Sequence, residues 1–356
     1  MADTNYPTGD PLAVKLWSKM LTREALYRTY AFRFMDREGN APIHIKPDTE
    51  QSAGDQVTFG LRMQLTGDGI TGDGQLEGQE EALVTYSDAI IIDQLRHAVR
   101  SAGRISEQRV HFSVRKEALD GLADWWSARI DTWFFNQICG NTITGVGIAY
   151  TGMQAATAPS STRHKIAGGK ADEDALTSSD TFKITEIDKV VEAARTTAGG
   201  DVLLRPIRID GNDRFVMFMH EYQRTSLRTE AGNQQWLEIQ KAVYMGTRQE
   251  NPIYWGSLGE YNGAVLHPTD RVPNGRAAAG GTAITTVRRA VLVGAQAASM
   301  AYGMGDGPSR YTWVEQTFDY GNKLGVAAGC ISGLKKNIFN SKDYAAIVLS
   351  SYAAAA

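Results

Sequence analysis

A glycine-rich stretch, Gly67-Asp-Gly-Ile-Thr-Gly72, matches the spacing G-x-G-x-x-G of dinucleotide-binding loops. In those loops a helix begins at the glycines, and its N-terminus binds the pyrophosphate. Here Asp73-Gly74 continues a turn, and the Asp68 carboxylate would repel a phosphate. The stretch therefore favours the tip of a turn over a nucleotide site.

The same stretch carries carboxylates that could bind calcium: Asp68, Asp73, Glu77 and Glu80. Their spacing is not that of the helix–loop–helix calcium motif. No two of the six histidines stand at the spacing of a zinc helix, and the two cysteines fit no metal or redox spacing. We expect no metal and no cofactor.

A charged cluster follows the glycine-rich stretch: Asp93, Arg96, Arg100 and Arg104. One interpretation is an acid/base site, and the favoured one is a salt-bridge network where two elements join. The sequence contains no nucleophile elbow and no phosphate-binding loop. It therefore offers no specific reason to propose an enzyme, and an unrecognised site at this cluster is the enzyme alternative.

Charge is concentrated in residues 41–95, which hold ten of the 40 acidic residues and two of the 37 basic ones. Their net charge of −8 compares with −3 for the whole chain. A chain with this balance is not built mainly to bind the backbone of nucleic acids. An acidic arm on a near-neutral body indicates docking against a basic surface, with a solvated loop region as the alternative.

Two strands are predicted within this acidic region. The apolar positions of the first are Val57, Phe59, Leu61, Met63 and Leu65. They alternate with small or polar residues such as Arg62, so the strand has one face to bury. The second strand covers residues 84–92. Because a two-stranded ribbon is rarely stable alone in water, we expect this face to lie on a neighbouring copy of the chain.

Helical spacing predicts a helix that starts at Asp10-Pro11 and a long helix over 107–139 whose three tryptophans pack in the core. A capping box formed by Thr185 and Asp188 predicts the start of another helix. The predicted helices are 11–35, 107–139, 185–198, 221–230 and 234–245. The predicted strands outside the ribbon are 214–220, 312–318, 325–330 and 344–350. Residues 141–180 lack periodicity and are expected to form a loop or surface insertion.

This order of elements resembles the tailed-phage, Hong Kong-type capsid fold, and several stretches resemble the major capsid proteins of the N4-like phages. The stretches are 10–19, 53–62, 76–81, 92–99, 256–263, 319–323 and 333–340. They stand in the family's order and cover nearly the whole chain.

The resemblance implies an α+β capsid fold with five parts. They are an N-terminal arm at 1–44, an extended β-hairpin loop at 45–95, a peripheral domain at 96–199 with spine helix 107–139 and insertion 141–180, an axial domain at 200–310, and strands at 311–356 that return to the peripheral domain.

The resemblance also implies a function: a major capsid protein whose pentamers and hexamers close into an icosahedral phage head around double-stranded DNA. Assembly would take place in the cytoplasm of a bacterial host. The implied partners are other copies of the chain, a portal protein, a decoration protein and packaged DNA bound non-specifically, with no membrane. Because only about ten residues precede the first helix, we expect a separate scaffolding protein.

In such a shell the acidic tip of the arm would meet basic residues of the next subunit. The acidic residues are Asp68, Asp73, Glu77, Glu80 and Glu81, and the basic candidates are Arg109, Arg115 and Lys116. A tail or baseplate protein is the structural alternative, although the long β-rich repeats typical of that class are absent from the sequence.

Overall fold

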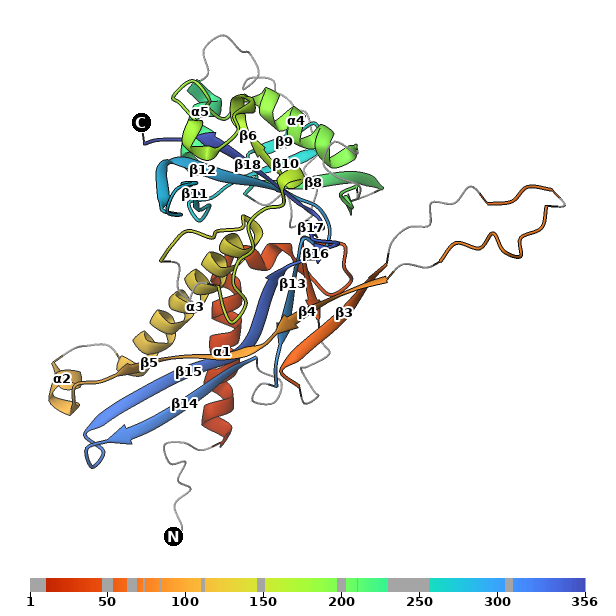
Figure 1. Ribbon diagram of the computed structural model, residues 1–356. Coiled ribbons are helices and arrows are strands. Elements are labelled where there is room, and N and C mark those ends of the chain that lie inside the picture. Colours follow the sequence, from red (N-terminus) through yellow and green to blue (C-terminus); the bar gives the residue numbers. More distant parts are fainter. Residues whose placement is uncertain are drawn as a thin grey trace.

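The computed structural model shows an α+β protein built around two sheets (Figure 1). The residues it describes are 11–46, 54–62, 69–72, 74–82, 85–109, 113–145, 151–196, 203–209, 211–229, 256–304 and 310–355. No helix among these residues is long and apolar enough to cross a membrane.

The first sheet has six strands and lies beside the two long helices, α1 (Pro11–Arg28) and α3 (Val114–Ile138). Its strands are β1 (Met35–Asp36), β2 (Ile43–Lys46), β13 (Ala298–Tyr302), β15 (Lys323–Lys336), β14 (Tyr311–Phe318) and β5 (Asp93–Arg100). The 14-residue β15 organises this sheet: its N-terminal part lies between β14 and β5, and its C-terminal end pairs with β13.

The second sheet has eight strands and forms the lobe that holds the C-terminus in Figure 1. Along the sheet the order is β6 (His164–Ile166), β18 (Ala346–Tyr352), β12 (Ala283–Val293), β8 (Asn212–Met219), β10 (Ala264–Pro268) and β9 (Gly259–Tyr261), with β11 (Asn274–Arg276) on β12 and β7 (Ile207–Ile209) on β8. Two helices belong to this lobe, α4 (Ile184–Arg195) and α5 (Glu221–Thr229).

Both faces of the second sheet are buried, which explains the continuous apolar run in β8. Val216 and Phe218 join the core shared with α3, whereas Phe215, Met217 and Met219 pack with the apolar face of α4. Successive side chains of a strand point to opposite faces, so a sheet covered on both sides needs apolar residues at every position.

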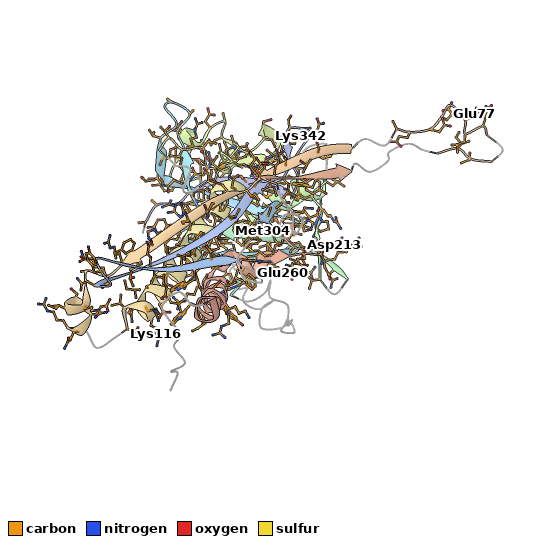
Figure 2. All side chains as sticks on the ribbon, turned by 90° about the horizontal axis from the view of Figure 1, so that it is seen from below. Glu77, Lys116, Asp213, Glu260, Met304 and Lys342 are labelled. Carbon is orange, nitrogen blue, oxygen red and sulfur yellow. The ribbon has the colours of Figure 1, made fainter. Side chains whose placement is uncertain are left out.

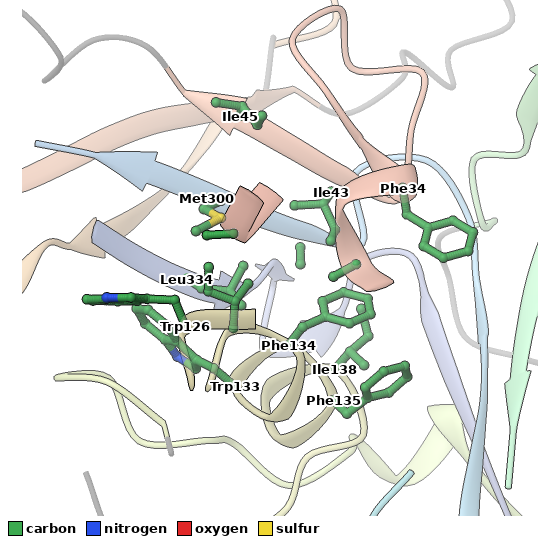
Figure 3. Packing of buried hydrophobic residues seen from close by; sticks show 14 of the residues in the cluster. Phe34, Ile43, Ile45, Trp126, Trp133, Phe134, Phe135, Ile138, Met300 and Leu334 are labelled. Atoms are coloured by element: carbon green, nitrogen blue, oxygen red, sulfur yellow. The ribbon is translucent and has the colours of Figure 1, made fainter. Parts of the chain in front are cut away.

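The shared core is rich in aromatic side chains, as Figure 3 shows. Trp126, Trp133, Phe134 and Phe135 of α3 are all buried, at 0–7% exposure. Phe34 reaches the same core from a 3-10 turn, and its ring meets that of Phe218 edge to face at 4.8 Å. The predicted role of the α3 tryptophans in core packing is confirmed for Trp126 and Trp133; Trp125 is partly exposed and stacks on His97.

The first helix ends earlier than predicted. α1 stops at Arg28, and a 3-10 turn, η1 (Tyr30–Phe34), follows it. The carboxylate of Asp131 accepts hydrogen bonds from the backbone N–H groups of Tyr30 and Ala31, at 3.1 and 2.9 Å. This contact from α3 satisfies donors that a continuing helix would have used.

The predicted helix over 107–139 is two helices. A short one, α2 (Arg104–Gln108), is separate from α3, which begins only at Val114. Ser113 before it is extended, with φ −78° and ψ 118°. The capping box at Thr185 is also wrong, since α4 begins at Ile184 with Lys183 at the N-cap and no side-chain cap.

Residues 141–145 and 151–180 are largely irregular and lie mostly at the surface, as predicted, but they are also tied into the fold. They contribute β6, which pairs in parallel with β18, and several short 3-10 turns. Glu173 within this segment is only 5% exposed and binds Arg289 of β12. The segment is therefore an irregular, largely exposed stretch that is anchored to the second sheet through β6 and Glu173.

The division at residue 310 also differs from the structure. β13 precedes this boundary but belongs to the first sheet, whereas β18 at the C-terminus pairs with β12 and β6 in the second sheet. The strands predicted at 214–220, 312–318, 325–330 and 344–350 are confirmed as β8, β14, β15 and β18, and the helix at 221–230 as α5. Residues 234–245 lie outside the described residues.

The folded subunit is expected to lose stability in acid because of His220, which lies between β8 and α5. Burial and the charge of Arg288 lower the pKa of His220 to about 4, with Asp270 opposing them. Below pH 6.5 His220 becomes protonated in the unfolded chain but stays neutral in the folded chain until the pH approaches 4. The free energy of unfolding therefore falls between pH 6.5 and 4. The expected loss reaches at most about 3 kcal/mol.

This expectation is tested by urea unfolding of the subunit across that pH range. The Nδ1 atom of His220 accepts a hydrogen bond from the Tyr222 N–H at 3.1 Å. His220→Asn can keep such a cap but cannot titrate. The variant should therefore show a flatter pH dependence than the natural chain, and equal slopes would contradict the assignment.

Candidate assembly surfaces

The predicted ribbon is present and projects from the body of the molecule (Figure 1). β3 (Gln56–Arg62) and β4 (Thr85–Ile91) pair antiparallel, with Val57 opposite Ile90 and Phe59 opposite Asp88. Paired residues point to the same side of a sheet, so Val57, Phe59 and Ile90 share one face at the base of the ribbon with Asp88.

The base of the ribbon is covered by its own chain. Val57, Phe59 and Ile90 are 3%, 9% and 0% exposed and pack with Ala301 and Phe339. The expectation that Val57 and Phe59 are buried on a neighbouring copy is therefore wrong. β13 and the small hairpin of β16 (Ile338–Phe339) and β17 (Lys342–Asp343) supply the apolar surface, and no local pattern could have placed them there.

Asp88 adds a polar attachment at this base. Its carboxylate pairs with the Lys335 ammonium and accepts hydrogen bonds from the backbone N–H groups of Ala89 (2.8 Å) and Ile338 (3.2 Å). Lys335 also donates to the Ala89 carbonyl at 3.3 Å. These contacts fix the end of β4 that is nearest the body. The sequence did not reveal the role of Asp88, because Lys335 and Ile338 lie about 250 positions away.

Asp88→Ala is expected to loosen the ribbon base. It removes the acceptor of the Ile338 N–H and the carboxylate partner of Lys335, which keeps only its bond to the Ala89 carbonyl. This loss should lower the free energy of opening β4 by about 1–3 kcal/mol. Amide hydrogen exchange of residues 85–91 measures this opening. Asp93→Ala is the matched control, since Asp93 is exposed and accepts only from the Gln94 N–H; equal exchange in both variants would contradict the role of Asp88.

The far part of the ribbon is exposed wherever the structure describes it, over 69–72 and 74–82. Glu77, Glu80 and Glu81 are exposed, as are the apolar side chains of Ile70 (37%) and Leu76 (60%). Figure 2 shows Glu77 far from the body. Other predicted contact residues lie outside the described residues: Met63, Leu65, Asp68 and Asp73 wholly, and Leu61 and Arg62 in their side chains.

The three basic candidates differ in whether their side chains are exposed for contact with another subunit. Arg109, which follows α2, and Lys116 of α3 are exposed. Arg115 is engaged within its own chain: its Nη2 lies 2.6 Å from the Glu315 carboxylate, and its guanidinium lies 5.9 Å from the Trp17 ring centroid. Lys116 and Glu77 lie at opposite ends of the molecule in Figure 2.

The charged cluster between residues 93 and 104 is not a salt-bridge network. Asp93, Arg96 and Arg100 lie on β5, where alternation sends Asp93 to the face opposite the two arginines. Arg100 covers the Phe318 ring at 4.2 Å, and Arg104 begins α2. No ion pair joins Asp93 to these arginines in the described part of the chain.

A buried ionic site lies elsewhere in the described part of the chain and was missed. Arg289 binds Glu173 through two bonds, Nε–Oε1 at 2.7 Å and Nη2–Oε2 at 2.8 Å, and donates to the Gly140 carbonyl at 2.8 Å. Burial alone would raise the pKa of Glu173, but hydrogen bonds from His164, Arg289 and Ser350 hold it well below its usual range. The site ties the end of α3 and residues 141–180 to β12.

One cavity of about 420 Å³ opens between β6 and α4. Its lining mixes Lys165, Lys170 and Lys189 with Glu186 and Glu192, and Lys189 already pairs with Glu186 at 2.8 Å. The charges do not converge on one ligand type. Among the described residues, no group of three or more His, Cys, Asp or Glu side chains could hold a metal ion.

Comparison with known proteins identifies the family. A family model described as phage capsid protein matches residues 5–355. The chain is 28% identical to the major capsid protein of Pseudomonas phage KPP25, over 92% of this chain and 89% of that protein. The capsid protein of Ralstonia phage GP4 has 33% identity and a TM-score of 0.81 over 99% of both chains. That of cyanophage Pam1 shares the fold, with 18% identity and a TM-score of 0.70 over 93% and 94%.

These relatives confirm the predicted capsid fold, and they are structural proteins rather than enzymes. The match to the GP4 capsid covers 99% of both chains, so it leaves no large segment of either chain uncovered. With a family model matching nearly its whole length, the chain belongs to the phage capsid protein family.

Proposed function

We propose that this chain is the major subunit of a tailed-phage head, and that its copies form pentamers and hexamers of an icosahedral shell around double-stranded DNA. The supporting observation is the end-to-end likeness to the GP4 capsid protein. The narrower placement among the N4-like phages rests on the motifs of the sequence, such as Asp319-Tyr-Gly-Asn-Lys323.

The ribbon is suited to contact between subunits in a ring. Closed rings need heterologous contacts, in which one surface of a subunit binds a different surface of the next. The acidic ribbon tip and the basic residues Arg109 and Lys116 are two such surfaces, with Lys116 and Glu77 at opposite ends of the molecule. The tip of one copy would therefore meet the basic surface of another copy.

Charge alone would hold such a contact weakly. An exposed ion pair contributes about 0–1 kcal/mol and less at high salt. Burial of Leu76 and Ile70, which are exposed in the single chain, would add about 1.5–3 kcal/mol for each side chain fully buried. Many such contacts act together in a shell, so each can be modest.

Further partners follow from this role. A separate scaffolding protein would guide assembly in the host cytoplasm, a portal protein would occupy one vertex, and a decoration protein could bind outside. Contact with the packaged DNA would be weak and non-specific, since the chain carries a net charge of −3.

The test is assembly itself. The chain is expressed alone and together with the scaffolding protein of the same phage, and the products are examined by light scattering and negative-stain electron microscopy. Shells, or rings of five and six subunits, are expected. A chain that stays small even with its scaffolding protein would overturn the proposal.

A further inference from the structure

The end of the β14–β15 hairpin displays apolar side chains far from the core. We define the distal tip as α2 together with the turn at 318–323, which lie at one end of the molecule in Figure 1. Tyr320 in the turn is fully exposed, and Ile105 of α2 is 70% exposed. In an isolated subunit neither exposed side chain gains free energy from apolar burial at this position.

The backbone of the turn makes the tyrosine more unusual. Asp319, Tyr320 and Gly321 have φ values of 54°, 50° and 82°, all in the left-handed region. Glycine or asparagine adopts this conformation readily, whereas a bulky aromatic residue does so at a cost. The fold of the single chain would be served better by another residue here, which points to a use of the tyrosine outside the single chain.

The turn holds Tyr320 in a defined position. The Asn322 N–H donates to the Asp319 carbonyl at 2.9 Å, and the Asn322 amide oxygen accepts from the Arg104 N–H at 3.3 Å. Asn322 thereby joins the turn to α2, and Arg100 covers the Phe318 ring beside it. An aromatic side chain presented on a rigid turn loses little freedom on binding.

We propose that Tyr320, together with Ile105 of the same distal tip, anchors a contact between this chain and a second copy of the same chain. This inference rests on the proposed shell function. The distal tip carries two acidic residues, Glu107 and Asp319, and two basic ones, Arg104 and Lys323. A surface of mixed sign can complement copies of itself, whereas a DNA-binding surface would be basic.

The test compares Tyr320→Asn with the matched control Tyr320→Phe. Asparagine suits the left-handed backbone, so the thermal midpoint of the unassembled subunit should stay the same or rise slightly. Assembly should weaken: the subunit concentration needed to form shells is expected to increase at least about tenfold, as for loss of an interface anchor. Phenylalanine keeps the ring and should assemble like the natural chain.

Residue-level footprinting of the natural chain provides a second measurement that needs no variant. Hydroxyl-radical labelling of Tyr320 should be strong in free subunits and at least severalfold weaker in shells. Unchanged labelling, or normal assembly of Tyr320→Asn, would overturn the inference. If the natural chain forms no shells, the result contradicts the proposed function and not the specific role of Tyr320. The two outcomes are therefore distinguishable.

Discussion

Replacing Glu173 by alanine is expected to destabilise the subunit by about 3–5 kcal/mol. The change removes the buried partner of Arg289, which is 4% exposed and cannot regain water without opening the fold. It also leaves the backbone N–H of Arg276 unpaired, since that group donates to Glu173 at 2.6 Å. Urea unfolding of the unassembled subunit measures the loss.

Asp172→Ala is the control for this experiment, because Asp172 is adjacent and exposed. It should change the stability by no more than about 0.5 kcal/mol. Arg289→Ala should destabilise as strongly as Glu173→Ala, and the double variant should cost less than the sum of the two because the charges share one interaction. Additive losses would show that the two side chains do not act as a pair.

Phe59→Asp is expected to open the base of the ribbon within the single subunit. A buried aromatic ring is replaced by a carboxylate, so β3 and β4 should lose at least about 3 kcal/mol of protection against amide exchange. This expectation follows from the cover that Ala301 and Phe339 provide. Shell assembly should fail as a consequence of the altered subunit.

Replacing Leu76 by aspartate should weaken assembly without destabilising the subunit. Leu76 is 60% exposed, so Leu76→Asp should leave subunit stability within about 0.5 kcal/mol. Assembly should nevertheless weaken, because the apolar side chain that would be buried on the next copy is lost. Normal shells from Leu76→Asp would contradict a role for the ribbon tip, and a stable Phe59→Asp ribbon would contradict the attachment of its base.

Periodic patterns in the sequence were sufficient for most elements. Alternation identified the ribbon of β3 and β4, and helical spacing identified α1 and most of α3. The boundaries failed where a distant residue intervened: Asp131 ends the first helix by binding the backbone of Tyr30 and Ala31. The irregular chain of residues 141–180 was expected, but its attachment through β6 and Glu173 carries no period to detect.

The residues of the assembly surfaces were only partly predictable. Acidic residues of the ribbon tip stand out by composition, and Glu77 is exposed as expected. Whether Val57 and Phe59 face a neighbour or their own chain could not be known, because alternation shows that a face is buried but not what covers it. The motif at 319–323 did not mark Tyr320 as a contact residue, since an exposed aromatic side chain in a left-handed turn is recognised only from coordinates.

By itself the sequence determined the element types, the acidic arm, the absence of recognisable catalytic motifs and, through motifs spread over the chain, the capsid resemblance. These are local properties, set by neighbours a few positions apart. Only the tertiary structure decided which strands share a sheet, that Glu173 lies against Arg289, and that Asp88 meets Lys335. The two ion pairs join residues more than 100 positions apart, and their energies depend on burial, which no short stretch of sequence specifies.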